Sequence, residues 1–358
     1  MPPRFACPAA VSSLPRRPVA RRLPDGLRAG RGAPEWVRVG PMVDRDGNGW
    51  TTCDLGHRHW GRFGAAGLLA YAPGDGGRRT SVLLQRRSWW GNHGGTWGPP
   101  GGARDSHESA VIAALREAEE ECAMPAGAVS PRGILRDDHG GWSYQTVVAA
   151  APRPFPVRAV SSETSKASWV AAESVAVLDL HPGFAAWWPV LREALLPLTI
   201  IVDGANVMGS RPDGWWRDRA GAARRLRDQL AVLRADGVTA LPETMQAPAL
   251  ERWFPDIVLV VEGAARSVAA AHAAAPGPSS PVSPGGEDGR RRPAREPGSA
   301  GGAVQVIAAP GSGDDTIAEV AADLAGRRLV VTADRELRAR CVAAGASVTG
   351  PSWLLGQI

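Results

Sequence analysis

The segment from Gly101 to Met124 constrains this chain more than any other, because it combines an amphipathic helical pattern with closely spaced acidic residues. At about 100° of rotation per residue, Glu117, Glu120 and Glu121 fall on one face of the expected helix. An apolar stripe lies roughly opposite and consists of Val111, Ile112, Leu115, Ala118 and Cys122. The helix should therefore pack on one side and present carboxylates on the other.

The acidic face requires a compensating charge, because no Lys or Arg lies between its glutamates. Hard divalent cations take oxygen ligands, so the pattern favours bound Mg²⁺ or Mn²⁺. The alternative is a solvated acidic helix face. Asp105 and Glu108 have the spacing of a capping box, which predicts that the helix begins near Ser106.

The spacing of this segment carries a resemblance. Gly102 is followed after five residues by Glu108, and after seven more by the run from Arg116 to Met124. This arrangement closely resembles the Nudix box. The chain departs from that pattern at Ala118, a small residue at an aliphatic position, and at Ala123, where the family has Gly. If the helix end needs a positive φ, Ala123 costs about 1 kcal/mol.

The resemblance implies a Nudix α/β/α sandwich with a mixed sheet over residues 42–197. It also implies hydrolysis of a nucleoside diphosphate linked to another group, with Mg²⁺ or Mn²⁺ held by Gly102 and the three glutamates, which would activate water. The expected substrate-binding residues are Arg86, Arg87 and Arg116. Trp89 and Trp90 either stack a base beside the two neighbouring arginines or cover the sheet.

The surrounding sequence fits one such domain. Strands are expected at Gly67–Tyr71, Ser81–Gln85 and Trp142–Val148, and a closing helix at Phe184–Leu191. The glycine-rich loop Gly94–Gly102 leads into the acidic helix.

The second half carries a separate pattern of apolar runs that are followed by acidic residues. The runs are Thr199–Asp203, Ile257–Glu262, Val304–Ala308 and Leu329–Asp334. Continuous Ile, Val and Leu runs are typical of parallel strands buried on both faces. Crossover helices are expected at Ala220–Leu233, Asp315–Leu324 and Glu336–Ala343. Because the carboxyl ends of such strands meet in one crevice, their acids should converge into a second metal site.

This half resembles the NYN group of PIN-like nucleases, through Asp203-Gly-Ala-Asn206, Asp314-Asp315 and Thr332-Ala-Asp334. The resemblance implies a doubly wound parallel-sheet domain over residues 198–358 that cleaves RNA. The expected metal ligands are Asp203, Glu262, Asp314, Asp315 and Asp334, of which Asp203 and Asp334 would also be catalytic, and Asn206 would bind substrate.

Three alternatives stay open for these two halves. The second-half acids are merely helix N-caps, with Asp314-Asp315 at a position where a cap is expected. The second domain is a non-catalytic interaction module. The chain is an RNA-processing nuclease whose Nudix half only binds a nucleotide or an RNA end.

Two segments have the composition of disordered chain. Residues 1–41 hold eight arginines against two acids and many prolines, so Met42 is an alternative start. Residues 275–302 are rich in Pro, Gly and Ser and would interrupt the second domain as a surface insertion. The first of these segments carries a charge of +6 and the remaining residues −1, so the formal net charge of +5 carries little information about the folded domains.

The four widely spaced cysteines do not form a disulfide framework, which favours the cytoplasm. Cys53, His57 and His59 have the chemistry of zinc ligands, but a structural zinc site needs a fourth. The alternative for these three residues is hydrogen-bonded packing of an N-terminal strand. No apolar stretch has the length of a membrane helix, so no membrane partner is expected.

Overall fold

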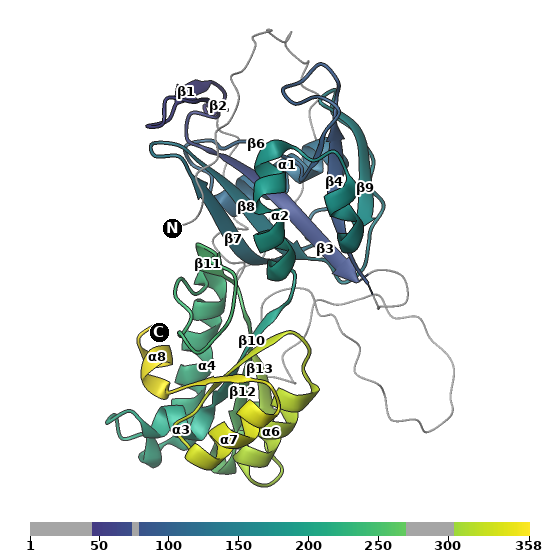
Figure 1. Ribbon diagram of the computed structural model, residues 1–358. Coiled ribbons are helices and arrows are strands. Elements are labelled where there is room, and N and C mark those ends of the chain that lie inside the picture. The colour runs from purple at the N-terminus through teal and green to yellow at the C-terminus, as the bar shows by residue number, and fades with distance from the viewer. Residues whose placement is uncertain (1–44, 74–78, 270–303) are drawn as a thin grey trace, which may run out of the picture. The chain divides into compact units, whose positions relative to one another are not determined.

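The computed structural model describes residues 45–73, 79–269 and 304–358, which form two compact units (Figure 1). The first unit runs to Leu195 and includes Pro248–Glu251, and the second comprises Leu196–Ala247 and Arg252–Ile358. The division lies close to the junction expected at Pro197. The predictions of disorder for residues 1–41 and 275–302 concern segments outside the described residues.

The first unit is built on a mixed sheet. Its strands are β3 (Ala65–Pro73), β4 (Thr80–Arg87), β5 (Trp97–Gly98), β6 (Gly101–Ala103), β7 (Ser130–Asp138), β8 (Ser143–Ala150) and β9 (Thr164–Ala171). The order is β7-β8-β3-β4-β5, with β6 paired to β3 and β9 to β4. Only β3 and β8 run parallel among these pairs, which gives the mixed sheet that the resemblance implies.

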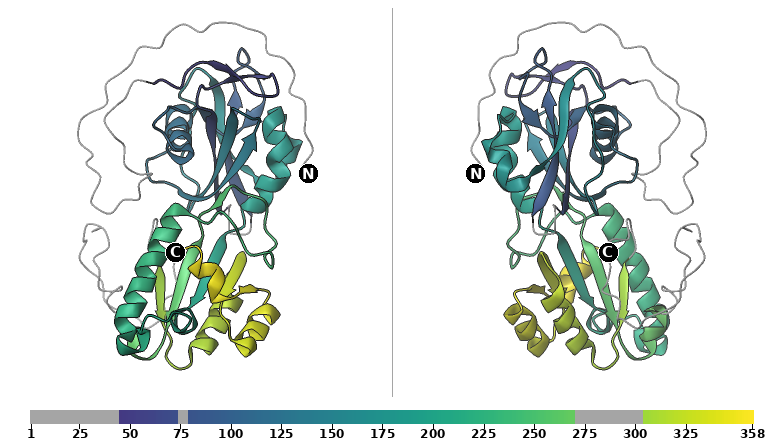
Figure 2. Two further views of the ribbon diagram at one scale, coloured as in Figure 1. Left: turned by 90° about the vertical axis from the view of Figure 1, so that its left-hand side faces the viewer. Right: turned by 90° about the vertical axis from the view of Figure 1, so that its right-hand side faces the viewer.

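Helices cover both faces of this sheet (Figure 2). These are α1 (Ala110–Cys122) and α2 (Pro182–Ala194), the latter preceded by a 3-10 helix, Ala172–Val177. Side chains alternate across β3, so Leu69 and Tyr71 face the α2 side and join a core with Phe184 and Trp188 of that helix. The unit is therefore an α/β/α sandwich. A separate hairpin of β1 (Trp50–Thr52) and β2 (Arg58–Trp60) precedes the sheet.

Helix α1 begins later than the capping-box spacing predicts. The Asp105 carboxylate accepts a hydrogen bond from Gly47 N at 2.7 Å, so it is engaged outside the helix. The Ser109 hydroxyl caps the helix instead, by accepting from Ile112 N at 3.2 Å. The return bond of the box is present, since Glu108 Oε2 accepts from Asp105 N at 3.1 Å.

The second unit has a parallel sheet in the order β13-β12-β10-β14-β15. Its strands are β10 (Leu198–Asp203), β12 (Asp256–Val261), β13 (Gln305–Ala308), β14 (Arg327–Val331) and β15 (Ser347–Thr349), and a short β11 (Arg252–Trp253) lies outside this order. Its helices are α3 (Gly204–Gly209), α4 (Arg219–Asp236), α6 (Gly313–Asp323), α7 (Arg335–Ala343) and α8 (Pro351–Leu355), with 3-10 turns at Trp215–Arg217 and Gly263–Arg266. The four expected strands and three crossovers are present, and β15 is an additional strand.

Helices again lie on both faces, with α4 on one side and α6 and α7 on the other (Figure 2). The core beneath α6 and α7 joins Ile317, Leu337 and Cys341 to Ile201 and Val330 of the sheet. Continuous apolar strands are explained by this two-sided burial. Among the described residues, no helix is long and apolar enough to cross a membrane.

Candidate active site

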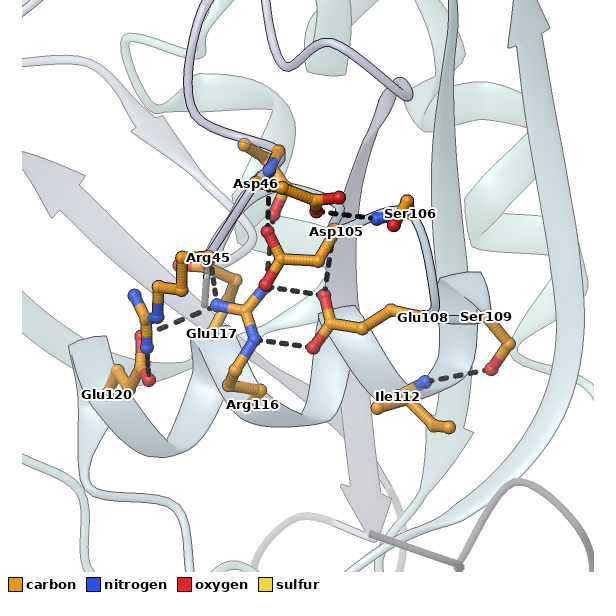
Figure 3. A network of polar contacts seen from close by, with 12 residues as sticks. Arg45, Asp46, Asp105, Ser106, Glu108, Ser109, Ile112, Arg116, Glu117 and Glu120 are labelled. Atoms are coloured by element: carbon orange, nitrogen blue, oxygen red, sulfur yellow. Dashed lines mark hydrogen bonds and ion pairs between the residues drawn. The ribbon is translucent and has the colours of Figure 1, made fainter. Parts of the chain in front are cut away.

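Helix α1 holds its acidic face in place through Arg116 (Figure 3). The guanidinium forms a two-bond ion pair with Glu108, with both N···O distances at 2.8 Å. It also donates to Glu117 at 2.6 Å and to the Ala103 carbonyl of β6 at 3.0 Å. Arg116 was predicted to bind substrate, but these contacts commit its guanidinium to the protein.

Glu121 is the most deeply buried of the three glutamates, with 6% of its surface exposed. Its Oε2 accepts hydrogen bonds from Gln85 Nε2 at 2.7 Å and from Gly101 N at 2.8 Å. Burial, followed by the nearby charge of Glu117, raises the pKa of Glu121 to about 8. The fold therefore holds a carboxyl group whose ionised form a nearby cation would stabilise.

Glu117 packs directly against Gly102. A Cβ atom at Gly102 would lie 2.7 Å from Glu117 Oε1, so a larger residue here would displace this carboxylate. Burial raises the pKa of Glu117, although Arg116 opposes the shift. Gly102 thus has a steric role in the site as well as its predicted role as a metal ligand, which stays a prediction.

Glu120 is the exposed member of the acidic face. It forms an ion pair with Arg45, and a second, longer contact of 3.5 Å with Arg116 (Figure 3). The carboxylate is therefore free to change partners at little cost, because exposed ion pairs contribute less than about 1 kcal/mol.

The three carboxylates suit a divalent cation by their chemistry. They offer oxygen ligands only, and two of them have raised pKa values that a cation would lower again. In the described residues, the carboxylate oxygens of these three glutamates do not all lie within 4.8 Å of one another. Magnesium retains several water ligands and needs only one or two direct carboxylates, so this looser arrangement fits it.

A cavity of about 200 Å³ is lined by the two residues that donate hydrogen bonds to Glu121. Its walls include Gln85 and Gly101, which both donate to Glu121, and the aromatic side chains of Tyr144, Phe184 and Trp187. Burial raises the pKa of Tyr144, so its hydroxyl stays protonated. The cavity is apolar with a polar edge, as in ligand pockets generally.

The two arginines at the end of β4, Arg86 and Arg87, differ in position. Arg87 lines this cavity, whereas Arg86 does not. Arg87 Nε donates to the Asn92 carbonyl, and Arg86 Nε donates to the Gly95 carbonyl, both at 2.9 Å. Trp89 is 86% exposed and Trp90 45% exposed. Trp89 therefore does not cover the sheet, whereas about half of the Trp90 surface is covered.

Two residues of this site were missed by sequence reasoning. Gln85 ends the expected strand Ser81–Gln85, yet its amide points inward and is 2% exposed. Tyr144 lies in the expected strand Trp142–Val148. A polar residue in an apolar strand was the available signal for Gln85, and the sequence held no comparable signal for Tyr144.

In the second unit, the acids converge as the parallel-sheet rule predicts. Asp203, Glu262, Asp314 and Asp334 line one cavity of about 520 Å³, together with Asn206. Burial, and then the charges of Asp314 and Glu262, raise the pKa of Asp203, although its hydrogen bonds oppose the shift. The pKa of Asp314 is raised by burial and then by Asp334 and Glu262.

Most of these acids also have a structural partner. Asp203 caps α3 by accepting from Asn206 N at 3.0 Å, and it accepts from the Thr332 hydroxyl at 2.9 Å. Asp334 caps α7 through Leu337 N at 2.8 Å, and Glu262 accepts from Gly313 N at 2.9 Å. Asp203 and Asp334 are therefore helix N-caps and also line the cavity.

The side chains of Asp314 and Asp315 point in different directions. Ser312 caps α6, so neither aspartate is the cap. Asp314 faces the cavity, but Asp315 does not line it and instead pairs with Arg340 at 2.8 Å. Successive helical residues point about 100° apart, so one of the two must leave the site. The Asn206 side chain accepts from Ala333 N at 2.9 Å and so joins α3 to the segment that follows β14.

The fold and the acidic helix define a metal-dependent hydrolase of the α/β/α sandwich class, and comparison with known proteins agrees. The model of the NUDIX domain matches residues 62–190, within the first unit. A protein named "Putative 8-oxo-dGTP diphosphatase 3" from Mycobacterium tuberculosis is 45% identical over 165 residues, which cover 44% of this chain and 74% of that protein. The chain belongs to the Nudix family.

Two further comparisons concern the same family. A "Nucleoside triphosphate pyrophosphatase/Nudix hydrolase fusion protein" from Bifidobacterium longum is 38% identical over 150 residues, which cover 41% of this chain and 31% of that protein. The crystal structure of a Nudix hydrolase from M. smegmatis, RenU, is 45% identical, covers 41% of this chain and 94% of that chain, and has a TM-score of 0.39. Nudix enzymes generally use divalent metal ions.

Proposed function

We propose that the first unit is a pyrophosphohydrolase that uses Mg²⁺ or Mn²⁺ to cleave a nucleoside diphosphate linked to another group. The observation that carries the proposal is the buried Glu121 carboxylate, whose two hydrogen-bond donors, Gln85 and Gly101, line an aromatic cavity. Phosphate oxygens and a metal would meet at the glutamates, while the cavity would take the base. The related M. tuberculosis protein makes 8-oxo-dGTP the first nucleotide to test.

The environment of each residue suggests its role in this reaction. Glu117, Glu120 and Glu121 would hold the cation, which supplies charge neutralisation at the phosphate and a more acidic bound water. Gln85 and Gly101 N orient the Glu121 carboxylate by their hydrogen bonds. Arg87, at the cavity edge, is the arginine best placed to meet phosphate or base.

The test is a hydrolysis screen of the full chain with Mg²⁺ and with Mn²⁺. The substrates are 8-oxo-dGTP, ordinary nucleoside triphosphates, nucleotide sugars, dinucleotides and capped RNA. Glu120→Gln should lower turnover at least about 100-fold, because metal ions supply several kcal/mol of transition-state stabilisation. Glu119→Gln is the matched control, since Glu119 is an exposed residue of the same helix that is not among the expected metal ligands.

The proposal fails if no substrate is hydrolysed in a metal-dependent way, or if Glu120→Gln turns over as fast as Glu119→Gln. Nucleotide binding without hydrolysis would support the interpretation that this unit only binds a nucleotide or an RNA end.

A second candidate function concerns the other unit, and the observation that favours it is the convergence of four acids on one cavity. We propose that this unit is an NYN/PIN-like ribonuclease that holds Mg²⁺ or Mn²⁺ between Asp203, Glu262, Asp314 and Asp334. Two such ions would clamp an in-line displacement of phosphate, and Asn206 would contact the RNA.

The test uses the full chain carrying Glu120→Gln, so that nucleotide hydrolysis does not interfere. End-labelled RNA should be cut with Mn²⁺ or Mg²⁺, and an added Asp314→Asn should abolish the cutting. Asp315→Asn is the matched control, because Asp315 pairs with Arg340 outside the cavity. If the chain cuts no RNA with any divalent metal, the interaction-module interpretation replaces this one.

A further inference from the structure

Four potential metal ligands from distant parts of the first unit lie together beside the β1–β2 hairpin. Cys53 follows β1, His57 precedes β2, His59 lies within β2, and His139 lies in the turn between β7 and β8. One ligand atom from each residue lies within 4.8 Å of the others. The sequence suggested the first three, and the fold supplies the fourth.

One ring nitrogen of each histidine in this group lacks a hydrogen-bond partner. His57 Nδ1, His59 Nε2 and His139 Nδ1 are buried and accept or donate no hydrogen bond in the described residues. Buried polar atoms without partners are rare and costly, so three in one cluster require an explanation. The alternative of hydrogen-bonded packing does not provide one.

We propose that Cys53, His57, His59 and His139 bind one Zn²⁺ ion. A thiolate with three imidazoles is a nitrogen and sulfur donor set, which zinc prefers and hard cations such as Mg²⁺ do not. Tetrahedral zinc has bond lengths of about 2.0–2.3 Å to such ligands, and the four atoms are already close enough for small shifts to reach them.

The contacts around the cluster match those of known zinc sites. His139 turns Nε2 toward the Asp137 carboxylate at 3.3 Å, which leaves Nδ1 directed into the cluster. Carboxylates that hold the second nitrogen of a ligating histidine are typical of zinc proteins. The His59 ring stacks on Trp142 at 4.0 Å, with an interplanar angle of 9°, and this fixes its orientation.

The cluster also supplies a buried thiol. Cys53 is 4% exposed and is a free thiol with no described disulfide partner, so its sulfur is available as well.

Four protein ligands leave no open position, so the site is structural rather than catalytic. The ion would join the β1–β2 hairpin to the β7–β8 turn, which Asp54 N also reaches through a 2.9 Å bond to the Gly140 carbonyl. His59, His139 and Trp142 line the same cavity as Gln85 and Gly101. Zinc would therefore fix one wall of the cavity to which we assign the nucleotide base.

The test measures metal content in the full chain, purified without chelators and dialysed against Mg²⁺. Mass spectrometry of metals should find about one zinc ion per chain. Cys53→Ser and His139→Asn should each reduce zinc at least about tenfold. His107→Asn is the matched control and should retain it, because His107 belongs to a separate group with Asp105 and Glu108.

A second measurement uses the wild-type chain, so that it does not depend on whether the substituted proteins fold. The wild-type chain, stripped of zinc, should take up one Co²⁺ ion and develop the absorption of a cobalt–thiolate bond. The proposal is overturned if the wild-type chain holds less than about a tenth of a zinc ion per chain, both as purified and after dialysis against zinc. It is also overturned if cobalt gives no thiolate absorption, or if His107→Asn removes the zinc. None of these results depends on hydrolase activity, so failure of the zinc site and of the proposed function are distinguishable.

Discussion

Glu121 links the stability of the first unit to pH. Its pKa of about 8 in the folded protein lies above its ordinary value of 4.5, so the folded state binds more protons than the unfolded state between these values. The free energy of unfolding of the metal-free protein should therefore fall as pH rises from about 4.5 to about 8. Glu121→Gln should remove this loss and raise the melting temperature at pH 8 but not at pH 5, as measured by calorimetry.

Bound metal should oppose this loss of stability at high pH. Saturating Mg²⁺ should stabilise the wild-type protein at pH 8 and leave Glu121→Gln nearly unchanged, because ligands that bind only the folded state stabilise it. Equal stabilisation of both proteins would contradict the role of Glu121 as a ligand.

Ala123 ends α1 in a left-handed conformation, with φ at 55° and ψ at 37°. The departure from the family glycine was expected to be costly if the helix end needs a positive φ, and the structure confirms that it does. Ala123→Gly should stabilise the protein by about 0.5–1 kcal/mol in urea unfolding. Ala126→Gly, in the following turn, should not stabilise, because Ala126 has no positive φ.

At the scale of elements, Arg116 fastens α1 to β6 and neutralises Glu108, whose side chain is only 5% exposed. Arg116→Met should cost about 3–5 kcal/mol, because it leaves a buried carboxylate without its partner. Arg45→Met removes an arginine from the 38% exposed Glu120 and should cost less than about 1 kcal/mol. Urea unfolding at neutral pH compares the two, and equal losses would show that Arg116 is not a buried anchor.

At the scale of the whole molecule, the two acidic sites belong to different sheets in different units. Substitutions that share no partner are expected to act additively. Glu120→Gln should therefore remove nucleotide hydrolysis and spare any RNA cleavage, while Asp314→Asn should do the reverse. Both activities are assayed in each variant and in the double variant. Loss of both activities from one substitution in a folded protein would point to a single shared site.

The sequence by itself determined the elements whose signals are local. The α1 pattern, the apolar strands of the second unit and the acids at their ends are all encoded within a few turns or one strand, where periodicity and spacing decide the geometry. The convergence of Asp203, Glu262, Asp314 and Asp334 also followed, because parallel strands place their carboxyl ends together.

Only the tertiary structure decided the contacts between segments far apart in the chain. It turned Gln85 toward Glu121, paired Asp315 with Arg340, and joined Arg116 to the Ala103 carbonyl of β6. It also brought His139 to Cys53, His57 and His59, which no local pattern predicts. The reason is physical: a residue's own spacing fixes its face on a helix or strand, but its partner depends on how the complete chain packs.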